Sequence, residues 1–285
     1  MSPERQDNDR LACFVCSLNL SGLTITKVIL WLVAITIVSF AIGFGILAIS
    51  GDFPPGAGQK ASPFKNTVLG SPNTTSFLPD GASSAEIRIL LGAGDLTLRG
   101  GAPGGRLMDA TVYSKRPEMQ PDYTESMNNS VKTVAMTETG HRKKDWVVAN
   151  APESWANTWD VRLGDEIPVA VTVNVGAGDC ELLLGDSNLT SLTVNTGAGD
   201  TTIDLAGYHG GWFDAFIYHG VGDLTLRIPR GSNTRILLHQ GVGDITANGM
   251  VQNNEQYTTA GFNPALPVNE ITLSQGVGSI QLEAV

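Results

Sequence analysis

Apolar and polar residues alternate in short runs along most of the chain after residue 85, and turn residues separate these runs. Residues 86–90 (EIRIL), 109–113 (DATVY) and 191–194 (SLTV) are examples. Alternation with a period of two, in runs rich in Val, Ile, Leu and Thr, predicts β-strands with one buried face. Residues 131–136 (VKTVAM) alternate more loosely and are also expected to form a strand. No amphipathic helix is predicted after residue 50, so this part of the chain is predicted to be all-β.

Six short phrases, each Gly-Ala-Gly or Gly-Val-Gly followed by Asp or Ser, recur between the alternating runs. They begin at residues 92, 176, 197, 220, 241 and 276, so the intervals between them are 84, 21, 23, 21 and 35 residues. Three intervals are nearly equal, and 84 is four times 21. A period of about 20–50 residues is typical of stacked supersecondary units rather than of a globular fold built around an active site.

Each phrase is predicted to be a sharp corner between two strands. Glycine adopts a positive φ without a Cβ clash, and the small Ala or Val between the glycines suits a narrow interior corner. The following Asp can accept a hydrogen bond from a nearby backbone N–H, as in an Asx turn. The predicted corner residues are Gly92, Gly94, Asp95, Gly176, Gly178, Asp179, Gly197, Gly199, Asp200, Gly220, Gly222, Asp223, Gly241, Gly243, Asp244, Gly276, Gly278 and Ser279.

Each unit then supplies two strands that stack about 4.8 Å from the next unit. We therefore predict an all-β fold, a β-solenoid or roll of stacked units of about 21 residues with mainly parallel pairing, preceded by one transmembrane helix.

Stacked corners would bring a column of aspartates together, namely Asp179, Asp200, Asp223 and Asp244. Two unit charges about 4.8 Å apart repel by roughly 0.9 kcal/mol in water, so backbone N–H groups or cations would have to relieve the repulsion. Calcium-binding β-rolls offer several oxygen ligands per turn, whereas this chain offers one Asp per unit. Structural caps are therefore the preferred interpretation, and a metal column is the alternative.

Residues 28–50 (VILWLVAITIVSFAIGFGILAIS) form a run of 23 residues without a charge. As a helix, this run would be about 35 Å long, against a hydrocarbon core of about 30 Å, and a membrane span is predicted. A cleaved signal peptide is the competing interpretation, because residues 48–50 resemble a cleavage site, but 27 residues precede the run. Lys27 beside the run favours a cytoplasmic N-terminus, which places the C-terminal domain outside the cytoplasm.

The predicted organisation has four parts: a polar tail (1–27), the membrane span (28–50), a flexible linker rich in Gly, Pro and Ser (51–84) and the β-solenoid domain (85–285). The net charge of −10 arises entirely after residue 50, because the charges before it sum to zero. An acidic domain argues against nucleic acid as a partner and against docking on anionic lipid headgroups.

Two further sets of residues could bind metal. Cys13 and Cys16 have the spacing of half a zinc site, but residues 1–27 contain no other Cys or His, so only a dimer could complete it. Reduced thiols or lipidation sites near the membrane are the alternatives. His219 and His239 both lie just before a corner, one unit apart, and could be neighbours in space.

No feature of the sequence indicates catalysis. The phrase Gly-Ala-Gly-Asp runs into a strand instead of opening a helix, so it is not a nucleotide loop, and no Gly-x-Ser-x-Gly elbow occurs. Some solenoids carry hydrolytic carboxylates in a groove, but no carboxylate pair stands out beyond the corners. Trp155, Trp159 and Trp212 suit either a carbohydrate or partner platform or the packing of a solenoid end. We predict a non-enzymatic protein without cofactors.

An ordered set of phrases supports a family resemblance. Residues 159–168 (WDVRLGDEIP) lead directly into residues 169–179 (VAVTVNVGAGD), residues 189–194 (LTSLTV) precede the next corner, and residues 249–250 (GM) precede residues 257–259 (YTT). Over residues 85–285, this order resembles the membrane-anchored toast-rack proteins related to LiaF, the group of cell-wall-active antibiotic response proteins. The resemblance implies a β-solenoid without catalytic residues, and bacterial members modulate a membrane sensor kinase during envelope stress. LiaF-like proteins often have several spans, whereas this chain has one predicted span.

Together, these features predict a single-pass protein of the cell membrane that displays a non-enzymatic β-solenoid outside the cytoplasm. It would act by protein contact in envelope sensing or the stress response, with an envelope protein such as a sensor kinase as its partner. A surface-exposed, adhesin-like or ligand-binding module is the alternative.

Overall fold

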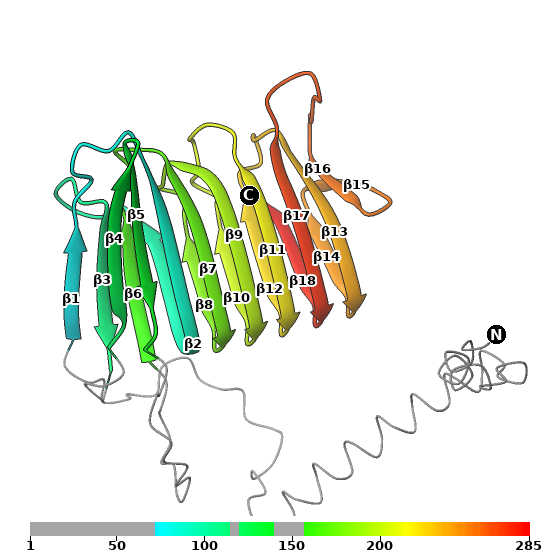
Figure 1. Ribbon diagram of the computed structural model, residues 1–285. Coiled ribbons are helices and arrows are strands. Elements are labelled where there is room, and N and C mark those ends of the chain that lie inside the picture. Colours follow the sequence, from blue (N-terminus) through cyan, green and yellow to red (C-terminus); the bar gives the residue numbers. More distant parts are fainter. Residues whose placement is uncertain (1–71, 115–119, 140–156) are drawn as a thin grey trace, which may run out of the picture. The chain divides into compact units, whose positions relative to one another are not determined.

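The computed structural model describes residues 72–114, 120–139 and 157–285 (Figure 1). All regular elements in these ranges are strands, as predicted, and β5 covers the loosely alternating residues 131–136. The strands are β1 (Pro72–Phe77), β2 (Ser84–Gly100), β3 (Met108–Tyr113), β4 (Asp122–Asn128), β5 (Val131–Thr137), β6 (Asn157–Leu163), β7 (Val169–Ala177), β8 (Cys180–Leu183), β9 (Leu189–Ala198), β10 (Thr201–Asp204), β11 (Asp214–Val221), β12 (Leu224–Ile228), β13 (Thr234–Val242), β14 (Ile245–Asn248), β15 (Met250–Asn253), β16 (Gln256–Thr259), β17 (Asn269–Val277) and β18 (Ile280–Ala284).

The predicted membrane span, Cys13, Cys16 and Trp155 lie outside the described residues. Within the described ranges, no helix has the length and apolar character needed to cross a bilayer.

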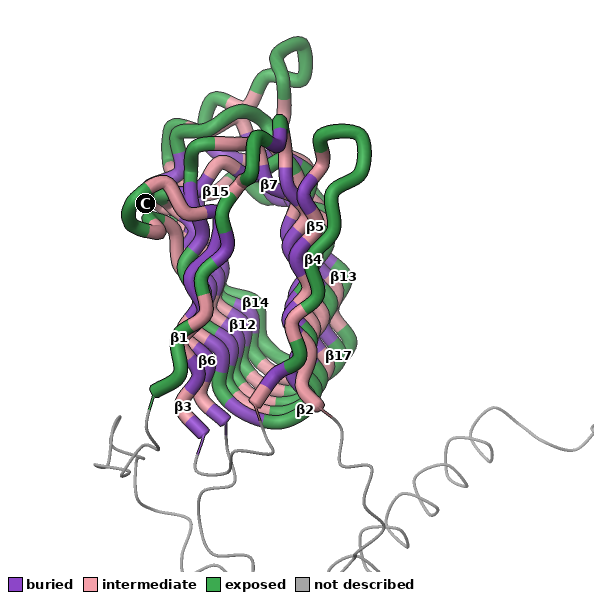
Figure 2. The backbone as a smooth tube through the Cα atoms, turned by 60° about the vertical axis from the view of Figure 1, so that its left-hand side comes forward, coloured by how far each residue is buried: buried purple, intermediate pink, exposed green. Residues whose placement is uncertain are grey.

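The strands form two facing sheets, called sheet A and sheet B here, which are joined along one edge (Figure 2). In the middle of sheet B, the first half of β2 is followed by β7, β9, β11, β17 and β13. In sheet A, the second half of β2 is followed by β8, β10, β12, β18 and β14. All these neighbours are parallel. One strand of each sheet and the corner between them make one coil, and the stacked coils form the predicted solenoid.

The order of the coils in space differs from their order in the sequence. The coil of β17 and β18 lies between the coil of β11 and β12 and the coil of β13 and β14 (Figure 1). Along the sequence, the end coil of β13 and β14 therefore comes first. The antiparallel hairpin β15–β16 follows, and β17 and β18 then lie between the end coil and the coil of β11 and β12. The 35-residue interval before the sixth phrase contains this excursion.

The 84-residue interval does not hold three further coils of the same kind, because β2 pairs directly with β7. Instead, the intervening chain forms the other end of the structure, where β3 pairs antiparallel with β6 and β4 pairs antiparallel with β5. β1 adds to the edge of sheet A by antiparallel pairing with β3. Residues 72–77 thus belong to the sheet and not to the predicted linker 51–84; a Pro at the first position of an edge strand, with Thr after it, is compatible with this role.

The core lies between the two sheets and is filled by the inward residues of each alternating run. Ile87, Ile89 and Leu98 of β2 are fully buried, and their counterparts in the stacked coils are buried too, except in β14 of the end coil, where Ala247 is only partly buried. Burying one such side chain contributes about 1.5–3 kcal/mol relative to exposure, so stacking, which covers both edges of each strand, stabilises units that could not fold alone. At the first end, Phe77 and Tyr123 close the core with ring centroids 5.5 Å apart.

Candidate functional site

The corner phrases close the coils at the edge where the sheets join. The second glycine of every phrase has a positive φ, between 125° and 146°. A Cβ at Gly199 would overlap the backbone carbonyl of Gly178 in the preceding coil, and a Cβ at Gly197 would overlap that of Gly176. Glycine is therefore required at the second position by conformation and at both positions by the close stacking of the coils.

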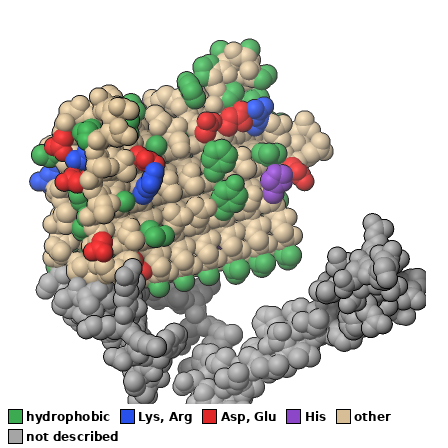
Figure 3. Space-filling model, viewed as in Figure 1, with side chains coloured by type: hydrophobic (Ala, Val, Ile, Leu, Met, Phe, Trp, Pro, Cys, Tyr) green, Lys and Arg blue, Asp and Glu red, His purple; other side chains and the backbone are tan. Residues whose placement is uncertain are grey.

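The residue between the two glycines points outward, contrary to the prediction of an interior position. Val221, Val277 and Val242 are 54%, 48% and 66% exposed, and the alanines at the same position are exposed as well. Because the positive-φ glycine reverses the chain direction after this residue, its side chain lies on the outside of the bend. Figure 3 shows hydrophobic side chains in a row along this edge.

The aspartates form the predicted column, with one change of order. Asp95 leads the column, and Ser279 lies between Asp223 and Asp244 because its coil is inserted there. Four of the carboxylates, those of Asp95, Asp179, Asp200 and Asp223, each accept a hydrogen bond from the backbone N–H of the next coil. The donors and acceptors are Asp179 N–H to Asp95 Oδ1 (3.2 Å), Asp200 N–H to Asp179 Oδ1 (3.0 Å), Asp223 N–H to Asp200 Oδ1 (2.9 Å) and Ser279 N–H to Asp223 Oδ1 (2.9 Å).

This ladder explains the aspartates without a cation. Each corner N–H would otherwise have no protein partner, and a hydrogen bond to a charged acceptor contributes about 1.5–3 kcal/mol. Within the described residues, no group of three or more His, Cys, Asp and Glu side chains could hold a metal ion. The geometry therefore assigns the column to linking adjacent coils.

A second row lies inside the corner, at the position before each phrase. It begins with Leu91 and Val175 and continues with the polar residues Thr196, His219, Gln275 and Gln240. These polar side chains are hydrogen-bonded along the row: Thr196 Oγ1 lies 2.6 Å from His219 Nδ1, Gln275 Nε2 donates to the Gly222 carbonyl (2.8 Å), and Gln240 Nε2 donates to the Gly278 carbonyl (2.7 Å).

Burial lowers the pKa of His219, while the Gly222 backbone and the carboxylates of Asp200 and Asp223 oppose that shift. His219 is only 3% exposed, whereas His239 is exposed on the outer face of sheet B, two coils away. The two histidines are not neighbours, so the predicted pair does not exist. The error has two sources: the inserted coil separates them, and a one-residue difference relative to the corner places them on opposite faces of the sheet.

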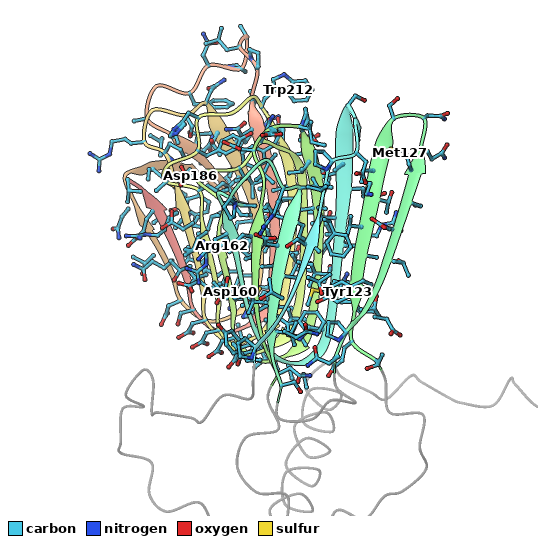
Figure 4. All side chains as sticks on the ribbon, turned by 90° about the vertical axis from the view of Figure 1, so that its left-hand side faces the viewer. Tyr123, Met127, Asp160, Arg162, Asp186 and Trp212 are labelled. Carbon is cyan, nitrogen blue, oxygen red and sulfur yellow. The ribbon has the colours of Figure 1, made fainter. Side chains whose placement is uncertain are left out.

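The described tryptophans do not form a common platform. Trp159 is fully buried in β6, while Trp212 is 65% exposed and lies on a loop (Figure 4). Cys180 is also buried, and burial, with a smaller contribution from Asp179, raises its pKa to about 12. A thiol with this pKa is not a nucleophile at neutral pH.

The outer face of sheet B carries the strongest candidate for binding. Phe216, Tyr218 and Leu237 form an exposed patch, named the aromatic patch here, in which they are 44%, 48% and 42% exposed. They replace Thr and Asn at the same register in neighbouring coils: Phe216 pairs with Thr193 and Thr272. Large exposed side chains that neighbouring coils lack indicate a contact surface rather than a packing requirement.

A shallow groove of about 880 Å³ runs beside this patch, along the first glycines of the corners. The first glycines face outward without a side chain, and this leaves the floor low. One wall consists of the residues two positions before these glycines: Leu90, Asn174, Asn195, Tyr218, Ser274 and His239. None of the residues that line the groove is Asp, Glu, Lys or Arg. Figure 3 shows the corresponding band above the edge, with few charged side chains.

Both outer faces carry ion pairs away from the groove, as Arg235 and Glu270 do on sheet B. On sheet A, Arg227 bridges Asp204 (3.1 Å) and Glu283 (2.9 Å) across three coils. The positive charge of Arg227 is thus paired with carboxylates of the same sheet.

Neither the groove nor the patch was predicted from the sequence. A signal was present in the residues four and two positions before the first glycine of each phrase, which face outward. In β7, β9, β11, β17 and β13 these residues are Thr and Asn, Thr and Asn, Phe and Tyr, Thr and Ser, and Leu and His. The aromatic pair stands out only when the coils are compared at equal distance from the corner.

The fold is a β-solenoid in which the outer face of one sheet carries exposed apolar side chains and a shallow groove. The chain belongs to the toast-rack family: the model of the N-terminal domain of toast_rack (DUF2154) matches residues 67–227. Among solved structures, the chain is similar to a "putative cell adhesion protein" from Clostridium sporogenes, with a TM-score of 0.69, 22% identity, and coverage of 75% of this chain and 99% of that protein. A "putative adhesin" from Bacteroides fragilis is 11% identical, with a TM-score of 0.27 and coverage of 75% and 97%. No curated protein matches the chain.

Proposed function

We propose that this protein is a membrane-anchored, non-enzymatic binding module of the cell envelope, which acts by contact through the outer face of sheet B. The aromatic patch is the observation that carries the proposal. Aromatic side chains are enriched at binding surfaces, and the rings of Phe216 and Tyr218, with the apolar Leu237, are exposed where neighbouring coils have Thr, Asn or Ser. The uncharged run at residues 28–50 supports the anchor, and Lys27 beside it supports display outside the cytoplasm.

The test uses the full chain in the cells that produce it. A photo-crosslinking amino acid at Leu237 should form adducts with an envelope component, whereas the same amino acid at Thr225, on the outer face of sheet A, should form few. Replacing Phe216 by Thr and Tyr218 by Asn, the residues of the neighbouring coil, should reduce the Leu237 adduct at least about fivefold. Equal adducts from both positions, or no adduct from either, would refute the proposal.

An envelope protein is a second candidate for what binds there, and a sensor kinase is the kind implied by the resemblance to LiaF-related proteins. The apolar pair Phe216 and Leu237 favours it, because apolar side chains fill the centre of protein interfaces. In that case the Leu237 adduct migrates as a discrete protein band that a protease destroys. An adduct that is resistant to protease would argue against a protein partner and for the adhesin-like alternative.

A further inference from the structure

We propose that the groove beside the aromatic patch binds a linear, uncharged polysaccharide that lies along the solenoid axis. This inference rests on the proposed function, because it assigns a ligand class to the same face of sheet B. The groove crosses the six coils, which at about 4.8 Å per coil makes it about 24 Å long. Its length and straightness fit a chain molecule rather than a compact ligand.

The wall of the groove offers unused hydrogen-bonding groups. Asn195 Nδ2 donates to Asn174 Oδ1 (2.8 Å), and the two amides make no other side-chain hydrogen bond among the described residues. Within the same part of the chain, the hydroxyls of Tyr218 and Ser274 make none. Amides and hydroxyls both donate and accept, and this suits the hydroxyl groups of a sugar. The Tyr218 ring adds a flat apolar surface with a polar tip.

Charge excludes other linear ligands. The protein has a net charge of −10, yet no Asp, Glu, Lys or Arg is among the residues that line the groove. Nucleic acids and anionic polymers need Lys or Arg to neutralise them, and a cationic peptide would be drawn to the acidic regions outside the groove.

An extended peptide also fits poorly. The floor lies on the face of a parallel sheet, whose backbone N–H and C=O groups are already paired between coils. A peptide strand gains its main-chain hydrogen bonds at a sheet edge and not on a face. A polysaccharide needs no backbone partners and uses side chains like those of the wall.

The experiment measures the mobility of the full chain, purified in an amine-oxide detergent, in native gels that contain a polymer. A glycosidic detergent would compete and is avoided. The neutral probes are hydroxyethyl cellulose, galactomannan and glycol chitin; polygalacturonate is the anionic probe, and polyethylene glycol is a neutral polymer without sugar rings. We expect retardation by at least one neutral polysaccharide and by neither comparison polymer.

Two variants of β11 localise the binding. Tyr218→Asn places the residue of the neighbouring coil in the wall and should weaken retardation about tenfold, the usual scale for a buried aromatic contact. Asp214→Ser is the matched control, because it also places the residue of the neighbouring coil at an exposed position of the same strand, outside both the groove and the aromatic patch, and it should change retardation less than twofold.

Retardation by none of the three neutral polysaccharides overturns the inference, as does equal retardation by polygalacturonate or an unchanged Tyr218→Asn variant. The crosslinking experiment from Leu237 separates this failure from that of the proposed function. Adducts without polysaccharide binding leave the contact function standing with another ligand, whereas the absence of both refutes both.

Discussion

The two edges of each coil differ sharply, although the same strands connect them. At the corner edge, two residues separate the strands of every coil after β2, and the same phrase recurs. At the opposite edge, the connections run from residues 184–188, through 205–213 and 229–233, to the excursion at 249–268. At the corner, the backbone of one coil lies directly on that of the next, so that no side chain fits between them. The connections at the loop edge differ in length and sequence, and some of their side chains, such as Tyr208 and Phe213, are buried over the end of the core. The difference shows that stacking constrains both glycines of the phrase, in addition to the positive φ that the turn imposes on the second one.

The largest expected effect comes from placing a side chain between stacked corners. Gly199→Ala should destabilise the domain by about 3 kcal/mol or more, because Gly199 has φ 125° and its Cβ would overlap the Gly178 carbonyl. Urea denaturation measures the loss. Gly211→Ala is the control at the loop edge, where a Cβ meets nothing within 4 Å; it should stay within about 0.5 kcal/mol. Equal losses at both edges would refute the comparison.

The second prediction concerns the hydrogen bonds that join the corners. Asp200→Ala should cost about 1–3 kcal/mol, because it leaves the Asp223 N–H without its acceptor. Asp200→Asn keeps an acceptor oxygen and removes repulsion from the column, so it should be neutral or slightly stabilising. Asp186→Ala, in an exposed loop, is the control in the same denaturation assay. If Asp200→Asn proved as harmful as Asp200→Ala, charge and not acceptor capacity would hold the corners together.

The third prediction tests the polar row inside the corner. Burial lowers the pKa of His219, so the unfolded chain binds its proton more readily than the folded chain does. The contribution of His219 to stability is therefore complete above the unfolded pKa of about 6.5 and decreases as the pH falls below it, by at most about 1.4 kcal/mol per pH unit.

The measurement is the free energy of unfolding at pH 7 and at pH 5. His219→Gln introduces the residue found in the next coil and should reduce the difference between these two free energies. His239→Gln, on the outer face, serves as the control and should leave it unchanged. A pH dependence that survives in His219→Gln would show that other groups cause it.

The smallest effect is expected at the loop edge itself. Trp212→Ala should change stability by less than about 0.5 kcal/mol, because the indole is 65% exposed and contributes little to the core. Calorimetry of this variant beside wild type checks the expectation. A loss above about 1 kcal/mol would show that this edge is also constrained by packing.

The local part of the fold could be predicted from the sequence. Period-two alternation placed the strands, and the glycine phrases marked the corners, because both signals depend on neighbouring residues. The order of the coils could not be predicted. Both β17 and β13 could pair with the free edge of β11, and the intervals between phrases record only the length of chain between them, not which strand pairs there. The wrong pairing of His219 and His239 follows from that single missing fact. The groove depends on the same register between coils and was missed for the same reason.

The position of β17 and β18 also has a consequence for the order in which the protein can be completed. Until residues 269–284 have been synthesised, β11 and β13 both lack β17, the parallel partner that they share in the folded domain. When β17 is added, it pairs with β11 and β13 at once and so joins the coil of β13 and β14 to the rest of the stack. The outermost elements on that side are β14 and the hairpin β15–β16, which pairs with β13, and all of them precede β17 and β18 in the chain. Pulling on residue 285 therefore loads the interior of the stack instead of peeling off its outermost strands.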